Sequence, residues 1–184
     1  MIDLRDLEEA DSERLYAWRR DPEVDRWMSG SKPRDADSHQ RWFEALRADP
    51  DRCGWIIAAD ADPVGFLVLA GLAGQHRRAE WGWFIGETQA RGRGAGRAAQ
   101  ALGLDRAFGE HAVEKVWSEV LAGNEVALKA QAAAGFRREG YLRRHVRKGD
   151  QVHDVVVLGI LRDEWMQRRE AARGDLAKSG LIAV

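Results

Sequence analysis

The sequence has little cysteine, no excess of either charge and no long apolar run, and each shortage excludes a class of protein. A single cysteine, Cys53, leaves no internal disulfide and no cysteine-based metal cluster. The chain balances 29 basic residues against 30 acidic ones, whereas nucleic-acid-binding domains are typically basic. We therefore expect no metal site and no nucleic-acid partner.

The apolar runs are too short for a membrane protein. None approaches the ~20 residues that cross a bilayer, and residues 1–6 lack the charged-then-apolar order of a secretion signal. Of the 184 residues, 45% are hydrophobic and eight are tryptophans, which is enough for the core of one ordinary domain. We expect a cytoplasmic protein with no membrane partner.

Apolar runs alternate with turn residues in a pattern that predicts a mixed α/β domain. Strands are expected over residues 2–4, 55–59, 64–72, 80–85, 115–121, 141–147 and 152–161. Helices are expected from residue 11 or 12 to before 22, from 37 or 38 to 48, over 95–108, over 124–134 and after 163, with an irregular stretch over 22–37. This order is not the strict alternation of a doubly wound fold.

The most informative segment is the glycine-rich run 91–96, Arg-Gly-Arg-Gly-Ala-Gly, between the expected strand 80–85 and the expected helix 95–108. Three alternate glycines let backbone N–H groups approach a ligand closely, and the two arginines add positive charge. Because the run opens a helix, it predicts a binding site for a diphosphate group.

Other interpretations of this loop fit less well. A nucleotide P-loop is excluded, because no Gly-Lys-Ser/Thr follows. Residues 94–99 formally satisfy the dinucleotide pattern G-x-G-x-x-A, but that pattern belongs at the first strand of a domain and this one lies mid-chain. A purely structural glycine turn does not call for Arg91 and Arg93.

The pattern Arg91-x-x-Gly94-x-Gly96 resembles the acyl-coenzyme A pyrophosphate loop of the GNAT superfamily of N-acetyltransferases. The strand before it, 79–85, resembles the family's fourth strand. Further along, Asn124 and the run 135–140, Gly-Phe-Arg-Arg-Glu-Gly, resemble the exit of the fifth strand and the turn after the next helix.

The resemblance covers residues 1–165 and implies a GNAT domain there, with a charged C-terminal tail over 166–184. It implies an α/β fold: a mixed, mainly antiparallel seven-stranded sheet, splayed between its fourth and fifth strands, with helices on both faces. It also implies acetyl-coenzyme A as donor substrate, with its pyrophosphate on the loop and its pantetheine arm along the fourth strand. The residues expected to bind it are Trp83, Phe84, Ile85, Arg91, Gly92, Arg93, Gly94, Ala95, Gly96, Arg97 and Asn124.

Acetyl transfer to an amine requires the neutral amine, and an alkylamine of pKa about 10.4 is only about one part in a thousand neutral near pH 7.4. A general base is therefore expected. The resemblance places one at the start of the fourth strand, where Glu80 lies, and Glu119 is a second candidate. The alternative for Glu80 is a solvated carboxylate at a strand end.

One position departs from the family pattern. Many members carry a tyrosine seven residues after the asparagine, as general acid for the departing thiolate. Counted from Asn124, that position is Gln131, and the expected helix 124–134 contains no tyrosine. An amide can at most donate a hydrogen bond to the sulfur, so the acid stays unassigned.

The N-terminal half resembles the acetyltransferases of nucleotide-linked amino sugars (the pseudaminic acid pathway type), in which this half forms the acceptor wall. The acceptor is then a primary amine of a small molecule, an amino sugar or similar metabolite. Ribosomal-protein and aminoglycoside acetyltransferases share this layout and remain alternatives. The candidate acceptor-binding residues are Arg19, Trp27, Met28, His39 and Trp42, although aromatic residues at helical spacing are also typical of a packed core.

Two further classes of function stay open. An acyltransferase that takes its acyl group from an acyl carrier protein is favoured by the missing tyrosine and by the basic run 143–148. A non-catalytic domain that only binds coenzyme A is the other. We expect a monomer or a homodimer, the latter paired through a free strand edge over 152–161.

Overall fold

Seven strands form one sheet in the order β1-β2-β3-β4-β5-β7-β6 in the computed structural model, which describes residues 1–30 and 32–183. All neighbouring strands run antiparallel except β4 and β5, which are parallel. This confirms the mixed, mainly antiparallel sheet expected from the sequence. The strands are β1 (Ile2–Asp6), β2 (Arg52–Ala59), β3 (Asp62–Ala70), β4 (Arg78–Ile85), β5 (Lys115–Leu121), β6 (Arg137–Lys148) and β7 (Gln151–Leu161).

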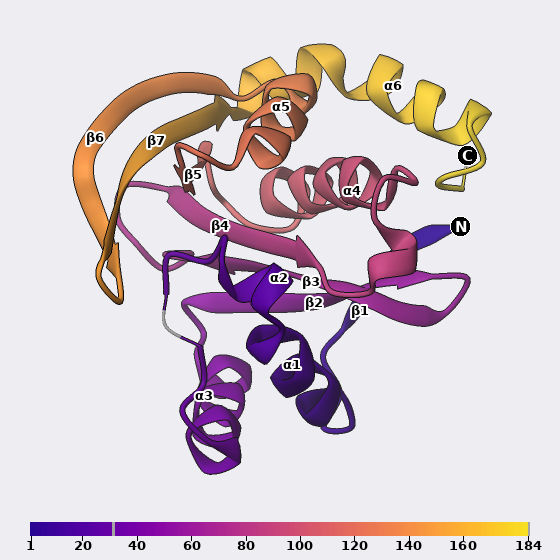
Figure 1. Cartoon of the computed structure of the whole chain (residues 1–184). Coiled ribbons are helices and arrows are strands. Elements are labelled where there is room, and N and C mark those ends of the chain that lie inside the picture. Colours follow the sequence, from indigo (N-terminus) through magenta and orange to yellow (C-terminus); the bar gives the residue numbers. More distant parts are fainter. Residues whose placement is uncertain (31, 184) are drawn as a thin grey trace.

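Helices cover both faces of the sheet, as expected (Figure 1). One face carries α1 (Asp11–Arg20), α2 (Pro22–Asp25) and α3 (Ala36–Ala48). The other carries α4 (Ala95–Gly109), α5 (Glu125–Ala134) and α6 (Arg162–Lys178), and a short 3-10 turn, η1 (Thr88–Ala90), follows β4.

The short helix α2 lies in the stretch that the sequence analysis expected to be irregular. Pro22 stands at the first helical position, where its lack of an N–H group costs no hydrogen bond. The side chain of Asp21 accepts a hydrogen bond from the Glu23 N–H at 2.9 Å and so caps the turn. These two local devices hold four residues in a helical turn that carries too few apolar residues to show a periodic pattern.

The two parallel strands separate soon after they meet. β4 and β5 pair through only three residue pairs, the last of which joins Glu80 to Trp117. From there β5 continues to pair with β7 on its other side, and β4 continues to pair with β3. The splay expected between the fourth and fifth strands is therefore confirmed, and it opens at Glu80.

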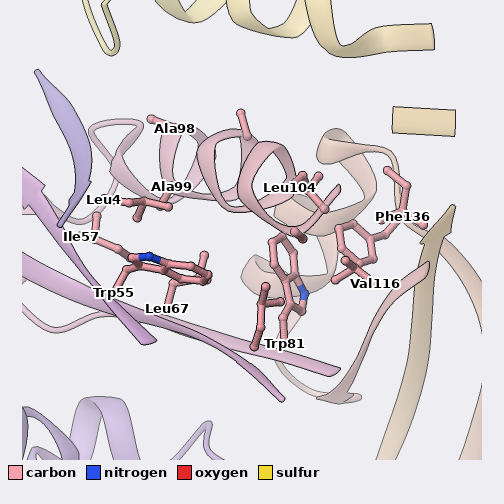
Figure 2. Packing of buried hydrophobic residues seen from close by; sticks show 14 of the residues in the cluster. Leu4, Trp55, Ile57, Leu67, Trp81, Ala98, Ala99, Leu104, Val116 and Phe136 are labelled. Carbon is pink, nitrogen blue, oxygen red and sulfur yellow. The ribbon is translucent and has the colours of Figure 1, made fainter. Parts of the chain in front are cut away.

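The main core lies between the sheet and α4. Helix α4 is rich in alanine and glycine, so it approaches the sheet closely over the large indole of Trp81 (Figure 2). At Gly103 a Cβ atom would lie 2.7 Å from Leu67 Cδ1, closer than real contacts allow. The indole of Trp81 stacks on the ring of Phe136 with centroids 4.8 Å apart, which joins β4 to the end of α5.

The last hairpin corrects one expectation. Of the two strands of this hairpin, β6 is the one at an edge of the sheet, whereas β7 lies between β5 and β6 and pairs on both sides. The expectation of a free edge over 152–161 is wrong. The reason is burial: Val155, Val156 and Ile160 of β7 are at most 1% exposed, while β6 carries mostly exposed charged residues, which protect an edge from further pairing.

The C-terminal segment packs onto the domain. The boundary expected at residue 165 falls inside α6, and Trp165, Leu176 and Ile182 are all buried in the main core. The indole N–H of Trp165 donates to the carboxylate of Asp105 on α4 at 3.0 Å. Beyond α6, the carbonyl of Leu181 accepts a hydrogen bond at 2.6 Å from the backbone of β1.

Truncation of one buried side chain tests this packing. We expect Leu176→Ala to lower the free energy of unfolding by about 2–5 kcal/mol, because the side chain is 1% exposed and its loss leaves a cavity. Met166→Ala on the same helix is the control, since Met166 is 53% exposed and its loss should cost less than about 0.5 kcal/mol. Urea unfolding measures both, and equally small effects would contradict the packing.

Candidate functional site

The glycine loop before α4 has the backbone shape that the sequence predicted. Gly92 and Gly94 take positive φ values of 74° and 87°, which favour glycine, and Gly94 directly precedes the first residue of α4. Gly96 is needed for a different reason, because a Cβ there would lie 2.9 Å from the Trp83 indole. The first backbone N–H groups of α4 thus lie where a diphosphate can approach them.

The two arginines of the loop differ in what they do. Arg91 donates from Nε to the carbonyl of Ile85 at 3.0 Å and from Nη2 to the carbonyl of Gly86 at 2.8 Å, so it ties the loop to the end of β4. Arg93 is solvent-exposed. The positive charge that the loop offers to an incoming anion therefore comes chiefly from Arg93.

The C-terminal segment forms one wall of this loop. A Cβ at Gly94 would lie 2.7 Å from Leu181 Cδ1, and the Arg97 guanidinium lies 3.9 Å from the carboxylate of Asp175 on α6. Sequence reasoning missed these contacts, because a segment more than 75 residues away leaves no local pattern in the loop.

Where β4 and β5 part, two polar side chains meet on the side of α4 and α5. Ser118 is the first residue of β5 beyond the last pair with β4, and its hydroxyl donates to Gln131 Oε1 at 2.7 Å. Both residues are buried. Asn124 lies just before α5, where its side chain accepts a hydrogen bond from the Ala127 N–H at 3.2 Å and caps the helix.

The two candidate bases share the opposite face of the sheet. Glu80 pairs with Trp117, and side chains two residues apart on a strand point to the same face, so Glu119 lies on the face of Glu80. Glu80 keeps contact with solvent, yet partial burial raises its pKa, and the negative charge of Glu119 raises that pKa further. His145 Nε2 lies 3.7 Å from the Glu119 carboxylate.

Two of the five candidate acceptor residues lie beside the turn that follows β5. Trp27 is 38% exposed, and its indole lies 3.8 Å from where a Cβ of Gly123 would be. Lys148, at the tip of the last hairpin, donates to the Met28 carbonyl at 2.8 Å and also to the Asp25 carbonyl. These hydrogen bonds anchor the segment after α2 to the tip of the β6–β7 hairpin.

The other three candidates pack against one another between α1 and α3. His39 is 2% exposed, and its ring nitrogens lie 2.8 Å from the Ser12 carbonyl and 3.4 Å from the Arg19 guanidinium. Burial is the main cause that lowers the pKa of His39. The Arg19 guanidinium stacks over the Trp42 ring at 3.8 Å. No hydrogen bond or ring contact among the described residues joins this cluster to Trp27 or Met28.

A solvent-open cavity of about 700 Å³ lies at an irregularity in β6, and one of its lining residues, His145, lies 3.7 Å from the Glu119 carboxylate. The register with β7 shifts between Leu142 and Val146, and Arg144 takes a positive φ of 53°. Asp154 holds this shape by accepting hydrogen bonds from the Arg144 N–H and the Tyr141 hydroxyl, each at 2.6 Å. The cavity is lined by Tyr141, Leu142, Arg143, Arg144, His145 and Asp154.

Neither a metal centre nor a bilayer-crossing helix accompanies this site in the described ranges. Residues 1–30 and 32–183 contain no group of three or more His, Cys, Asp or Glu side chains placed to share a metal ion. No helix in these ranges has the length and apolar character that crossing a bilayer requires.

Residues 2–137 match the family model of the acetyltransferase (GNAT) domain. The chain belongs to this family. As a GNAT protein it is an acetyl-coenzyme A-dependent N-acyltransferase. The structure fits that donor. The left-handed Gly92 and Gly94 lead into the N-terminus of α4, and beyond Glu80 the edge of β4 that faces β5 has no strand partner.

Other GNAT proteins are similar over almost their whole length. The uncharacterized N-acetyltransferase YnaD of Bacillus subtilis (strain 168) is 24% identical over 163 residues, which cover 88% of this chain and 94% of YnaD. The uncharacterized N-acetyltransferase p20 of Bacillus licheniformis is 24% identical over 170 residues, or 89% and 94% of the two chains.

A solved structure shows the same fold. The crystal structure of spermidine N-acetyltransferase from Vibrio cholerae in complex with CoA and spermine superposes with a TM-score of 0.84. The two chains are 20% identical, and the match covers 90% of this chain and 98% of the Vibrio chain. At this identity the likeness concerns the fold alone.

The carboxylate pair of this GNAT domain gives a direct test of its electrostatics. Replacing Glu119 by glutamine removes the negative charge beside Glu80. Without that repulsion the ionised form of Glu80 is favoured, so the pKa of Glu80 should fall towards its ordinary value. It should stay above that value, because burial is the larger cause. Carbon-13 NMR titration of the Glu80 carboxyl measures the shift. Glu125→Gln on the exposed start of α5 is the control, and an unchanged Glu80 pKa in Glu119→Gln would contradict the coupling.

Proposed function

We propose that this GNAT domain transfers an acetyl group from acetyl-coenzyme A to a primary amine of a small molecule, with Glu80 as general base. The observation that carries the proposal is the position of Glu80 at the point where β4 and β5 part, with a pKa raised above its ordinary value. A carboxylate with a raised pKa is a stronger base, and it lies at the opening through which an amine reaches the splay.

The donor is proposed to bind along the loop and the splay. The N–H groups of residues 92–96 and the charge of Arg93 bind its pyrophosphate. The backbone of Trp83, Phe84 and Ile85 has no strand partner on the β5 side, so its pantetheine amides can pair there in the manner of an added strand. Asn124, at the start of α5, lies by the thioester region.

In the reaction, Glu80 takes the proton of the attacking amine, directly or through one water. Glu119 keeps the pKa of Glu80 high by charge repulsion and so acts on it rather than on the substrate. We assign Glu119 this positioning role in place of the second-base role.

For the acceptor we propose an amino sugar or a similar small metabolite. The exposed ring of Trp27 supports it, since an aromatic face beside the splay can stack on a sugar or a base. The Vibrio cholerae neighbour is named for spermidine, itself an amine, which agrees with the reaction class.

A second donor is proposed beside acetyl-coenzyme A, namely an acyl group carried by an acyl carrier protein. The exposed arginines of β6, among them Arg143 and Arg144, favour it, because they offer a basic surface beside the cavity near Glu119. The two candidates differ in the donor alone.

Replacement of the proposed base tests the function. We expect Glu80→Gln to slow acetylation of a panel of amines by about 10²–10⁴-fold, because the amide cannot accept the proton. Release of free thiol from acetyl-coenzyme A follows the rate. Stabilisation of the fold by coenzyme A should be unaltered in this variant, about 2.7 kcal/mol at a 100-fold excess over Kd.

Arg93→Glu provides the converse control. It should weaken stabilisation by coenzyme A and leave the pKa of Glu80 unchanged, because the loop lies away from the carboxylate pair. The assignment of Glu80 as the base would be contradicted if Glu80→Gln acetylated every amine that the wild-type protein accepts at an unchanged rate.

A further inference from the structure

Gln131 is a polar residue in the position of α5 where an apolar one would pack most easily. Helix α5 has a single buried residue, Gln131, which is 3% exposed. Burying an amide costs free energy unless it is hydrogen-bonded, and here Ser118 Oγ donates to Oε1 at 2.7 Å. Two buried polar residues, one on β5 and one on α5, are thus paired with each other.

That hydrogen bond leaves the other end of the amide available. Ser118 uses Oε1, and no described residue accepts a hydrogen bond from Gln131 Nε2. The nitrogen also differs from the buried atoms without a partner, such as Trp81 Nε1 and Gln100 Oε1, because it is not sealed from solvent. The amide of Gln131 therefore keeps N–H donors that no described residue uses.

The place of this amide follows from the strand register. Ser118 is the first β5 residue beyond the Glu80–Trp117 pair, and it points to the side of α5. Glu80 and Glu119 lie on the opposite face of the sheet. A thioester held in the splay therefore has the carboxylates on one side and the Gln131 amide on the other.

We propose that Gln131 stabilises the departing thiolate by donating a hydrogen bond from Nε2 to the sulfur, with Ser118 fixing the orientation of the amide. The assignment rests on the proposed function of the splay. The hydrogen bond from Gln131 would stabilise the departing thiolate, whereas a general acid would stabilise it by protonating the sulfur.

The step balances without a further reactant. The amine nitrogen forms a bond to the acyl carbon, and its proton goes to Glu80. The carbon–sulfur bond breaks, and its electron pair remains on sulfur, where the N–H of Gln131 faces the new negative charge. A hydrogen bond to a charged acceptor is stronger than one to a neutral acceptor, so the contact favours the thiolate over the thioester. The thiolate takes its proton from water after release.

A titration of bound coenzyme A tests this proposal without any acceptor amine. A thiol has an ordinary pKa of about 8.5, and the ultraviolet absorbance of the thiolate reports its ionisation. We expect coenzyme A bound to the wild-type protein to titrate below free coenzyme A. In Gln131→Met the pKa of the bound thiol should rise by about one unit relative to wild type, and in Gln131→Glu it should rise further, because a carboxylate repels the thiolate.

Two more variants separate this role from a structural one. Ser118→Ala frees the amide and should raise the thiol pKa by less than Gln131→Met does. Gln100→Met is the matched control, because Gln100 is a buried glutamine of α4 whose Nε2 already donates to the Gly96 carbonyl, and it should leave the thiol pKa unchanged.

The outcomes distinguish this proposal from the proposed function. If coenzyme A binds and the pKa of its thiol is the same in wild type, Gln131→Met and Gln131→Glu, the role of Gln131 is overturned and the donor site stands. If the wild-type protein binds no coenzyme A, the proposed function fails as well. A rise in Gln131→Met and Gln131→Glu, with none in Gln100→Met, supports the role.

Discussion

The site depends on the short parallel pairing of β4 and β5. Three residue pairs bring Glu80 beside Trp117, and the strands then separate. Backbone N–H and C=O groups without a strand partner are costly to bury, so an opening inside a sheet calls for a ligand or water to satisfy them. At this opening the carboxylates of Glu80 and Glu119 lie on one face of the sheet, and the Gln131 amide lies on the other.

The opening is held by the contacts on its two sides. β4 pairs with β3 over six residue pairs, and β5 pairs with β7 over seven, so each strand is firmly held along its outer edge. The Trp81–Phe136 stack then joins β4 to the end of α5 across the splay. Arg91 donates to the carbonyls of Ile85, the last residue of β4, and of Gly86 just beyond it, and this places the glycine loop at the end of the opening.

Local features of this architecture could be predicted from the sequence. Gly94 before α4, the Asn124 cap of α5 and the left-handed Gly135 after it each follow from the chemistry of a few neighbouring residues. The resemblance of the loop to a coenzyme A site also spans few residues. Counting seven positions from Asn124 identified Gln131 as a departure from the family pattern.

Features that depend on contacts between distant segments could not be predicted. The hydrogen bond of Gln131 to Ser118 and the contact of Leu181 with the loop each join segments that the sequence keeps apart. The edge position of β6 depends on how the last hairpin docks, which the charges of β6 favour but do not determine. His39 illustrates the same limit, since helical spacing does not reveal that its ring contacts the Ser12 carbonyl of α1.

The central claim is that the splay between β4 and β5, together with the glycine loop, holds the donor. Amide hydrogen exchange with and without coenzyme A tests it most directly, because it reads the backbone groups concerned one by one. The account predicts that coenzyme A slows exchange at Trp83–Ile85 and Gly92–Gly96 and leaves the exposed strand β6 unchanged. Binding of coenzyme A that protects other segments and leaves both of these ranges as they are would contradict it.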